Sequence, residues 1–593
     1  MSAQYRDIQT VDSESYSYIF EENASVPLGN GGTVRCNVYR PKAASAETKF
    51  PVLMTYGPYG KDVPYKDFNP KSFAEVHVTH QTEHSAWETP TPQFWTDHGY
   101  IVIRTDEIGI GQSPGVLHVK SASSIEGFRD VIEWAAKQHW SSGKVGLLGV
   151  SYYAATQWQV ASLRPKGLAA IVPWEGFSDT YSESLRHGGI LSNKFYSVWY
   201  SRQVAPNQYG LPGRAARNWG PDTVEGDLSC EELNENRREA VLHAQRYRDD
   251  NDLSSLNFNL EDVTVPILSV ANLGGILLHL RGNVLGYLWA GSEFKYLRFI
   301  TGRHDLPFYY PEEVEVQKSF LDAWLKEDDR EGWTKKGAMP AVDLVLRQGN
   351  NGYNNPRVEK IFLHRKENEW PLARTEYTPF YLTINNTLQR DQPEQKLPSK
   401  ITYRALGEGS PSDILTFTSA PFVSETEITG HIVAHLNVSI SRDRWGGSPS
   451  DLDLFLTLRH FSPSGEEISY TGSAGEPVPV TKGWLRVSLR KTNPQHPRHR
   501  TWLPYRDYYS TDVLPVIPNE VYSVDVEIWP TNVVVESGGR LTLEVSSGDT
   551  SGTGFWGHDD PIDRSEDIFK GQNHIHFGPD YDNYISLPII PAK

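Results

Sequence analysis

The segment GLLGVSYYAATQW (residues 146–158) has the pattern of an apolar strand that turns into a helix at Ser151. A serine hydroxyl becomes a useful nucleophile when a base takes its proton and donors stabilise the developing oxyanion. A sharp strand-to-helix turn exposes such a serine and requires small residues beside it. Gly149 and Ala154 meet this need, whereas Tyr153 stands where the G-x-S-x-G pattern has its second glycine. The segment favours a nucleophile over the alternative, a buried serine that caps a helix.

The first 305 residues contain the elements needed to position this serine. Short apolar runs alternate with helical patterns, which predicts an α/β fold with a buried parallel sheet. The expected strands are residues 51–56, 100–105, 144–149, 168–173, 266–271 and 295–301. A helix between the second and third strands places Ile125, Phe128, Ile132 and Ala135 on one face.

The domain boundaries follow from changes in this pattern. Residues 1–176 and 263–364 form the predicted α/β core, and the polar, helix-forming segment 177–262 is an insertion that caps the ligand-binding edge of the sheet. Residues 365–593 alternate short apolar segments with turns, which predicts an antiparallel sandwich or jelly roll. Asp451 and Asp453 alternate on one of these strands. A turn-facing or solvated pair is favoured there over a metal site.

Composition narrows the classes of function. The formal net charge of −17 argues against nucleic acid or an anionic membrane as the main partner. Cys36 and Cys230 are the two cysteines, which excludes a disulfide framework. The polar start of the chain lacks the apolar core of a signal peptide, and the longest apolar stretch, residues 267–280, is too short to span a bilayer. We therefore expect a cytoplasmic protein.

Several motifs together resemble one family of enzymes. IEWAAKQHWSSGKVG (132–146) followed by GLLGVSYYAATQW is similar to the cocaine-esterase and X-prolyl dipeptidyl-peptidase family of α/β-hydrolases, with His139 in place of the usual proline. The likeness extends to TYGPYGK (55–61), DEIGIGQSPG (106–115), PWEGFSDTYSESLRHGGI (173–190) and NYISLPIIP (583–591). The resemblance implies an α/β-hydrolase core with an inserted helical cap and a C-terminal β jelly-roll domain, in agreement with the boundaries above.

The resemblance also implies roles for individual residues. Ser151 would be the nucleophile, and the backbone N–H of Tyr152 with the hydroxyl of Tyr59 would form the oxyanion hole. His304, in GRHDLP after the last core strand, would be the base, because an imidazole accepts the serine proton and returns it to the leaving group. A surface histidine is the alternative for His304, and a packed loop aromatic is the alternative for Tyr59. His279, in LLHLRG, fits a structural position on a helix.

The orienting acid departs from the family pattern. Alignment on the LHLRG segment places Leu273 where relatives have tryptophan and Gly275 where they have aspartate. Three interpretations remain: Glu175 after the fourth strand supplies the carboxylate, Asp305 assists its neighbour His304, or the protein works with a dyad or does not hydrolyse its ligand. Ile108, which replaces a family arginine, is a second departure.

The leading hypothesis is a serine hydrolase that cleaves an ester, lactone or amide of a small molecule. The alternatives are a retooled acyltransferase, lyase or cyclase, and a non-catalytic binding protein. We expect the cap to set specificity, with substrate-binding walls drawn from Trp174, Tyr196, Trp199 and Tyr200. No metal or organic cofactor is implied, and His574 and His576 are expected to be structural. A homo-oligomer is compatible with this interpretation.

Overall fold

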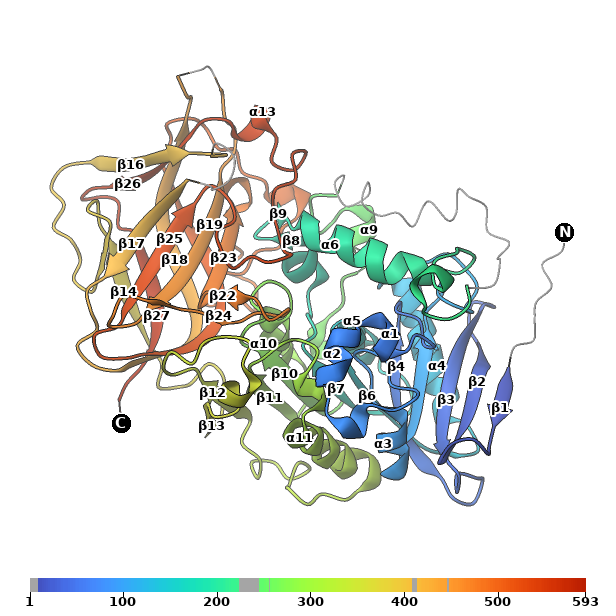
Figure 1. Cartoon of the computed structure of the whole chain (residues 1–593). Helices are drawn as coiled ribbons and strands as arrows, with labels where there is room; N and C mark the ends of the chain where they lie inside the picture. Colours follow the sequence, from blue (N-terminus) through green and yellow to red (C-terminus); the bar gives the residue numbers. More distant parts are fainter. Residues whose placement is uncertain (1–8, 223–244, 255, 408–412, 445–446, 593) are drawn as a thin grey trace.

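The computed structural model describes residues 9–222, 245–254, 256–407, 413–444 and 447–592. An α/β core and a β-rich C-terminal domain lie side by side, and the described part of the segment between β7 and β10 lies above the junction between them (Figure 1). No helix in the described ranges is long and apolar enough to cross a membrane.

The core is built on an 11-stranded sheet in the order β1-β2-β3-β5-β4-β6-β7-β10-β11-β12-β13. Neighbours from β5 to β12 in this order pair in parallel. All six strands expected from the sequence form within it. The strands are β1 (Thr10–Asp12), β2 (Tyr18–Pro27), β3 (Thr33–Pro41), β4 (Phe50–Gly57), β5 (Ile101–Asp106), β6 (Ser141–Val150), β7 (Leu168–Trp174), β10 (Ile267–Asn272), β11 (Lys295–Ile300), β12 (Val342–Leu346) and β13 (Leu363–Glu367).

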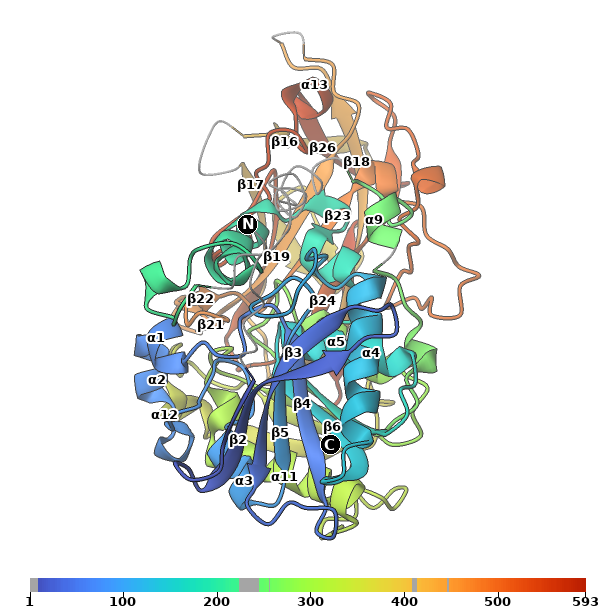
Figure 2. The ribbon, with the colours of Figure 1, turned by 90° about the vertical axis from the view of Figure 1, so that its right-hand side faces the viewer.

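Helices cover both faces of this sheet because its strands are apolar on both sides. Adjacent residues Leu147 and Leu148 belong to two different hydrophobic clusters, one on each face. The predicted helix forms as α4 (Ala122–Ala136), with the four expected side chains buried and Ser121 capping its start. Helices α4 and α5 (Tyr152–Ser162) pack on one face, and α3 (Pro92–Asp97) and α11 (Pro311–Leu321) pack on the other. In Figure 2 the N-terminal strands lie in front with α4 beside them.

The remaining helices of the core are short, apart from α10 (Leu280–Trp289), which follows β10 and packs against it. They are α1 (Tyr65–Phe68), α2 (Pro70–Glu75), η1 (Val78–His80), η7 (Pro307–Tyr309), η8 (Asp322–Lys326) and α12 (Pro356–Glu359). Because α1, α2 and η1 all lie between β4 and β5, they belong to one long connection at the carboxyl edge of the sheet.

The insertion between β7 and β10 contains short helices and one small hairpin in its described part. Its elements are η2 (Tyr181–Leu185), β8 (Arg186–His187), β9 (Ile190–Leu191), α6 (Asn193–Trp199), η3 (Tyr200–Val204), η4 (Ala205–Asn207), η5 (Ala215–Arg217), α9 (Asn251–Ser254) and η6 (Leu260–Asp262). Most of the polar segment 230–250, with Cys230, lies outside the described residues. The described elements lie over the junction of the core and the C-terminal domain (Figure 1).

The C-terminal domain is a 12-stranded sheet in the order β16-β26-β18-β24-β23-β19-β25-β17-β15-β14-β27, with β20 beside β19. Because β27 also pairs with β18, the sheet closes on itself as expected for a jelly-roll-like barrel. Its strands are β14 (Glu376–Leu382), β15 (Thr387–Gln389), β16 (Ser399–Arg404), β17 (Ile414–Ser419), β18 (Thr426–Ser441), β19 (Asp453–Phe461), β20 (Glu467–Ile468), β23 (Thr481–Arg486), β24 (Tyr522–Val535), β25 (Arg540–Ser546), β26 (Gln572–Phe577) and β27 (Tyr584–Ile590). A separate hairpin pairs β21 (Tyr470–Thr471) with β22 (Pro477–Val478), and the short helices are η9 (Val487–Leu489), η10 (Ser510–Asp512) and α13 (Glu566–Phe569).

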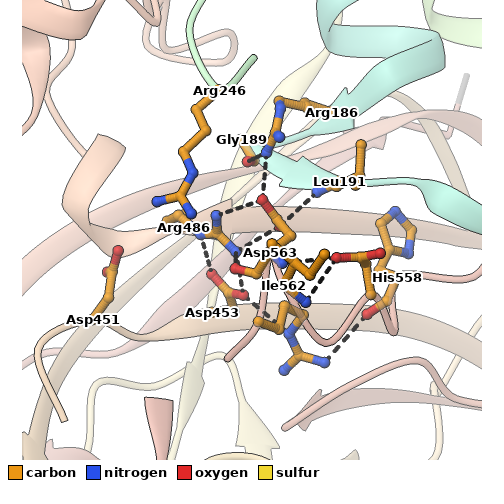
Figure 3. A network of polar contacts seen from close by, with 12 residues as sticks. Arg186, Gly189, Leu191, Arg246, Asp451, Asp453, Arg486, His558, Ile562 and Asp563 are labelled. Carbon is orange, nitrogen blue, oxygen red and sulfur yellow. Dashed lines mark hydrogen bonds and ion pairs between the residues drawn. The ribbon is translucent and has the colours of Figure 1, made fainter. Parts of the chain in front are cut away.

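A buried network of ion pairs joins the insertion to the C-terminal domain (Figure 3). Asp563 accepts hydrogen bonds from Arg186 of β8 at 2.7 Å and from Arg486 of β23 at 2.9 Å. Arg486 also pairs with Asp453. The expectation of a turn-facing or solvated pair at Asp451 and Asp453 is therefore wrong: both are buried, because arginines bind Asp453 and Ser488 binds Asp451. Among the described residues, no group of three or more His, Cys, Asp or Glu side chains is arranged to hold a metal ion.

Candidate active site

Ser151 lies at a strained turn between β6 and α5. Its backbone has φ 61° and ψ −116°, a conformation that non-glycine residues rarely adopt. The turn is held from the neighbouring strand, because the Ser151 N–H donates to the carbonyls of Trp174 and Glu175, each at 3.1 Å. Strain of this kind collects at functional sites, where the surrounding structure over-determines it. The geometry is that of a nucleophile elbow rather than an ordinary helix cap.

Tyr153, the residue that departs from the G-x-S-x-G pattern, is accommodated by glycines on other elements. A Cβ atom on Gly57 would lie 2.8 Å from the Tyr153 ring, and one on Gly149 would lie 2.7 Å from its Cβ. The helix after the nucleophile can therefore carry a large side chain at this position. Gly176 plays a similar part for Ala154, since a Cβ on it would lie 2.4 Å from the Ala154 Cβ.

The imidazole that contacts Ser151 belongs to His279, at the start of α10. Its Nε2 lies 3.2 Å from the Ser151 Oγ. The ring stacks between Phe177, at 5.6 Å and 3°, and His304, at 5.0 Å and 10°. The expected position on a helix is the start of α10, and the turn from Asn272 to His279 carries the ring back over the elbow.

His304 reaches the site after β11, as expected, but two carboxylates hold its nitrogens. Its Nδ1 lies 2.8 Å from Glu175 Oε2, and its Nε2 lies 3.2 Å from Glu88 Oε1. Burial alone would lower the pKa of His304, but Glu175 and then Glu88 outweigh it and raise that pKa well above the usual value. The resting structure therefore pairs His304 with acids, and the histidine contact of Ser151 is made by His279.

The two carboxylates are buried and lie on strained backbone. Glu88 and Glu175 have φ values of 63° and 47°. The Glu88 carbonyl accepts the N–H of Val150, and the Glu175 carbonyl accepts that of Ser151, so both are tied to the elbow. Asn272 Nδ2 donates to Glu175 Oε1 at 3.0 Å. Burial raises the pKa of both glutamates, against the opposing effect of His304.

The structure also shows what occupies the position of the expected aspartate. The N–H of Gly275 donates to the Asn272 carbonyl at 3.0 Å, and a Cβ at Gly275 would lie 3.2 Å from that oxygen. A compact turn thus replaces a carboxylate there. Asp305 accepts hydrogen bonds from Ser72 and Arg303, with no hydrogen bond to His304. Of the acids considered from the sequence, Glu175 is the one in contact with His304.

The two expected oxyanion donors lie beside Ser151. Tyr152 is the first residue of α5, where a backbone N–H has no carbonyl partner within the helix. The Tyr152 hydroxyl donates to Glu107, and burial raises the pKa of Glu107 to about 7. The Tyr59 side chain faces Ser151, and its hydroxyl accepts a hydrogen bond from Trp199 Nε1 at 2.9 Å. Burial, followed by the charge of Glu88, raises the pKa of Tyr59 well above its usual value, so the phenol keeps its proton.

A small cavity of about 20 Å³ adjoins the nucleophile. It is lined by Tyr59, Lys120, Ser151, Tyr152, Phe177, Ser184, Phe195, Tyr196, Trp199 and Leu278. Two of the four aromatic residues expected in its wall, Tyr196 and Trp199, are therefore present. Trp174 is not, because its side chain lies in the core against Phe308 at 5.5 Å. Tyr200 is also absent from the wall, since it packs beside Tyr196 within the insertion.

Two residues of the site were missed by the sequence analysis. Glu88 lies in a long β4–β5 connection whose sequence, SAWETP, has no periodic or motif signal. For His279, the LLHLRG segment favours a structural position on a helix. The signal that could have found it is the LGGILLH segment itself, because a glycine-rich turn after a core strand directs the next residues toward the carboxyl edge of the sheet.

A parallel sheet with helices on both faces and a serine on such an elbow defines an α/β-hydrolase. The nearby imidazoles and oxyanion donors are typical of a serine hydrolase. Two family models match the chain. Residues 30–279 match the X-Pro dipeptidyl-peptidase (S15 family) model, a range that includes Ser151, Glu175 and His279 but ends before His304. Residues 334–586 match the X-Pro dipeptidyl-peptidase C-terminal non-catalytic domain. The chain belongs to the CocE/NonD X-Pro dipeptidyl-peptidase family of serine hydrolases.

Individual relatives are similar to this chain over nearly its whole length. The chain is 25% identical to the cocaine esterase of a Rhodococcus species, over 97% of this chain and 99% of that protein. A CocE/NonD family hydrolase from Staphylococcus aureus, known from a crystal structure, is 28% identical to this chain in sequence, with a TM-score of 0.79. The alignment covers 98% of this chain and 96% of that protein's chain. An α-amino acid ester hydrolase, 17% identical with a TM-score of 0.65, shares the fold.

Proposed function

We propose that the protein hydrolyses an ester of a small molecule, with lactones and amides as related substrates, through an acyl-enzyme on Ser151. The observation that supports this most is the strained elbow, which presents the Ser151 hydroxyl beside the Tyr59 hydroxyl and a small cavity. The relatives named as esterases point to the same chemistry. The relatives do not favour the alternatives, which are a retooled acyltransferase, lyase or cyclase and a non-catalytic binding protein.

The proposed reaction uses His304 as the base and Glu175 as its orienting acid. Neutral His304 takes the Ser151 proton as Oγ attacks the carbonyl carbon, and Glu175 on Nδ1 stabilises the resulting imidazolium. The proton then passes to the leaving group, and a water repeats the sequence to release the acid. In this proposal His304 Nε2 exchanges its partner Glu88 for the Ser151 hydroxyl when the substrate binds.

The oxyanion is stabilised by the N–H of Tyr152 and the hydroxyl of Tyr59. The indole N–H of Trp199 already donates to the Tyr59 oxygen, so the phenolic proton remains available for the substrate. Because Trp199 belongs to the insertion, the cover over the site also supports the oxyanion hole. Each donor aimed at the developing charge lowers the activation free energy by about 3–4 kcal/mol.

Aromatic side chains line the cavity beside the nucleophile. Its walls include Phe177, Phe195, Tyr196 and Trp199, which would contact an apolar part of a bound ester. We therefore propose esters with an apolar acyl or alcohol group as substrates. The test is a series of p-nitrophenyl esters from acetate to octanoate. The proposal expects the wild type to hydrolyse members of this series and Ser151→Ala to lose kcat/KM for all of them, whereas equal rates for both proteins would refute it.

A further inference from the structure

We propose that His279 is a second catalytic histidine, which remains neutral and donates a hydrogen bond from Nε2 to the Ser151 oxygen. This inference rests on the proposed function, because it concerns the same nucleophile. It assigns to His279 a task separate from the base: His279 orients the hydroxyl and stabilises the charge that develops on Oγ when the proton leaves.

Packing fixes the His279 ring in place. The ring is 1% exposed and lies between the parallel faces of Phe177 and His304. Its backbone N–H donates to the Gly275 carbonyl, and its own carbonyl accepts from Asn283 at 3.2 Å. With both the backbone and the ring faces held, the distance of 3.2 Å from Nε2 to Ser151 Oγ is set by the fold.

The surroundings of the other ring nitrogen assign the tautomer. Nδ1 of His279 is buried and has no hydrogen-bond partner among the described residues. A buried N–H without an acceptor is rarer in proteins than an acceptor without a donor. The proton of the neutral ring therefore belongs on Nε2, which makes His279 a donor to Ser151 and leaves Nδ1 as the bare nitrogen.

The charges around His279 keep it from acting as the base. The titratable groups that face it are His304, on the stacked ring, and Lys120, whose ammonium lies 4.1 Å from the centre of the Phe177 ring. Burial, then His304 and Lys120, lower the pKa of His279 well below the usual value. His279 keeps its single proton throughout, while the Ser151 proton moves to His304 and then to the leaving group.

The experiment compares His279→Phe, which keeps an aromatic ring in the stack, with His279→Gln, which keeps an N–H donor. Hydrolysis of p-nitrophenyl acetate is followed against pH. We expect His279→Phe to lower kcat about 10²–10³-fold with KM changed less than about twofold and the acid limb at the same pH. His279→Gln should recover part of kcat. His431→Phe replaces another buried histidine, in β18, and is the control for general destabilisation. It should keep the wild-type kcat.

Two outcomes would overturn the inference. An unchanged kcat in His279→Phe would make the ring a packing residue. Loss of the acid limb in that variant, with activity retained in His304→Ala, would make His279 the base. If the Phe variant does not fold, ¹⁵N spectra of histidine-labelled wild type still decide the matter, because a protonated Nδ1 contradicts the assignment. Wild type that hydrolyses no ester would instead refute the proposed function, and the spectra would still report the tautomer.

Discussion

Replacing Glu88 with glutamine should move the acid limb of the pH–rate profile toward lower pH. In the proposed reaction His304 must be neutral to accept the Ser151 proton, and the two glutamates raise its pKa. Activity in the wild type should therefore rise with pH through a value above about 6.5, the ordinary histidine pKa. Glu88→Gln removes one of the two charges and keeps a similar shape.

The size of the shift follows from the contact. A unit charge 3.2 Å from His304 Nε2 contributes about 5 kcal/mol at an effective dielectric constant of about 20. Burial of Glu88 raises the pKa of its own carboxyl and so reduces this effect. Neighbouring charges at such distances shift pKa values by about 1–3 units. We therefore expect the acid limb of kcat/KM to move down by about 1–3 pH units.

The assay is kcat/KM for p-nitrophenyl acetate between pH 5 and 10, corrected for spontaneous hydrolysis. Glu83→Gln is the matched control, because Glu83 lies in the same connection but its side chain is 64% exposed. Its profile should match the wild type. An acid limb that stays in place in Glu88→Gln would refute the reasoning, since Glu88 would then carry no charge beside His304.

Glu175→Gln should lower kcat by about 10⁴-fold with a small change in KM, because the amide neither holds the tautomer nor stabilises the imidazolium; activity within tenfold of wild type would exclude Glu175 as the acid. Trp199→Phe should lower kcat about fivefold, the value of one neutral hydrogen bond, and should have no further effect in a Tyr59→Phe background. Asp563→Asn should destabilise the protein by about 3–5 kcal/mol in urea unfolding, because Arg186 and Arg486 stay buried without their shared carboxylate. Burial opposes ionisation of Asp563, but Arg486 and Arg186 outweigh it and lower its pKa. This contribution is therefore present above about pH 4 and is lost as the pH falls further. The exposed Glu566→Gln is the control and should leave stability nearly unchanged.

The sequence predicted the elements well because their signals are local. Buried strands are apolar throughout, and α4 repeats its apolar residues at helical spacing. Both patterns can therefore be recognised in the sequence without knowledge of tertiary contacts. The elbow at Ser151 is also local, since Gly149 and Ala154 flank it. The core position of the Trp174 side chain could also have been predicted from the sequence. It follows Ala170 and Val172 at alternate positions of β7, all three on the face covered by α11, which directs the side chain away from the site.

The histidine and carboxylate contacts could not be predicted in the same way. They depend on where turns from separate segments meet: the connection that carries Glu88, the turn from Asn272 to His279, and the loop after β11. The alternation of Asp451 and Asp453 likewise said nothing of Arg486 and Arg564, which reach Asp453 from other segments. Such long-range pairings leave no pattern in a single sequence.

The central claim is that Ser151 is an activated nucleophile, and intact-mass spectrometry with a small fluorophosphonate tests it most directly. We predict one covalent adduct on the wild type, no adduct on Ser151→Ala, and labelling slowed about 10³-fold or more in His304→Ala. An adduct of equal size and rate on Ser151→Ala, or a folded wild type that takes none while it hydrolyses no p-nitrophenyl acetate, would contradict the account.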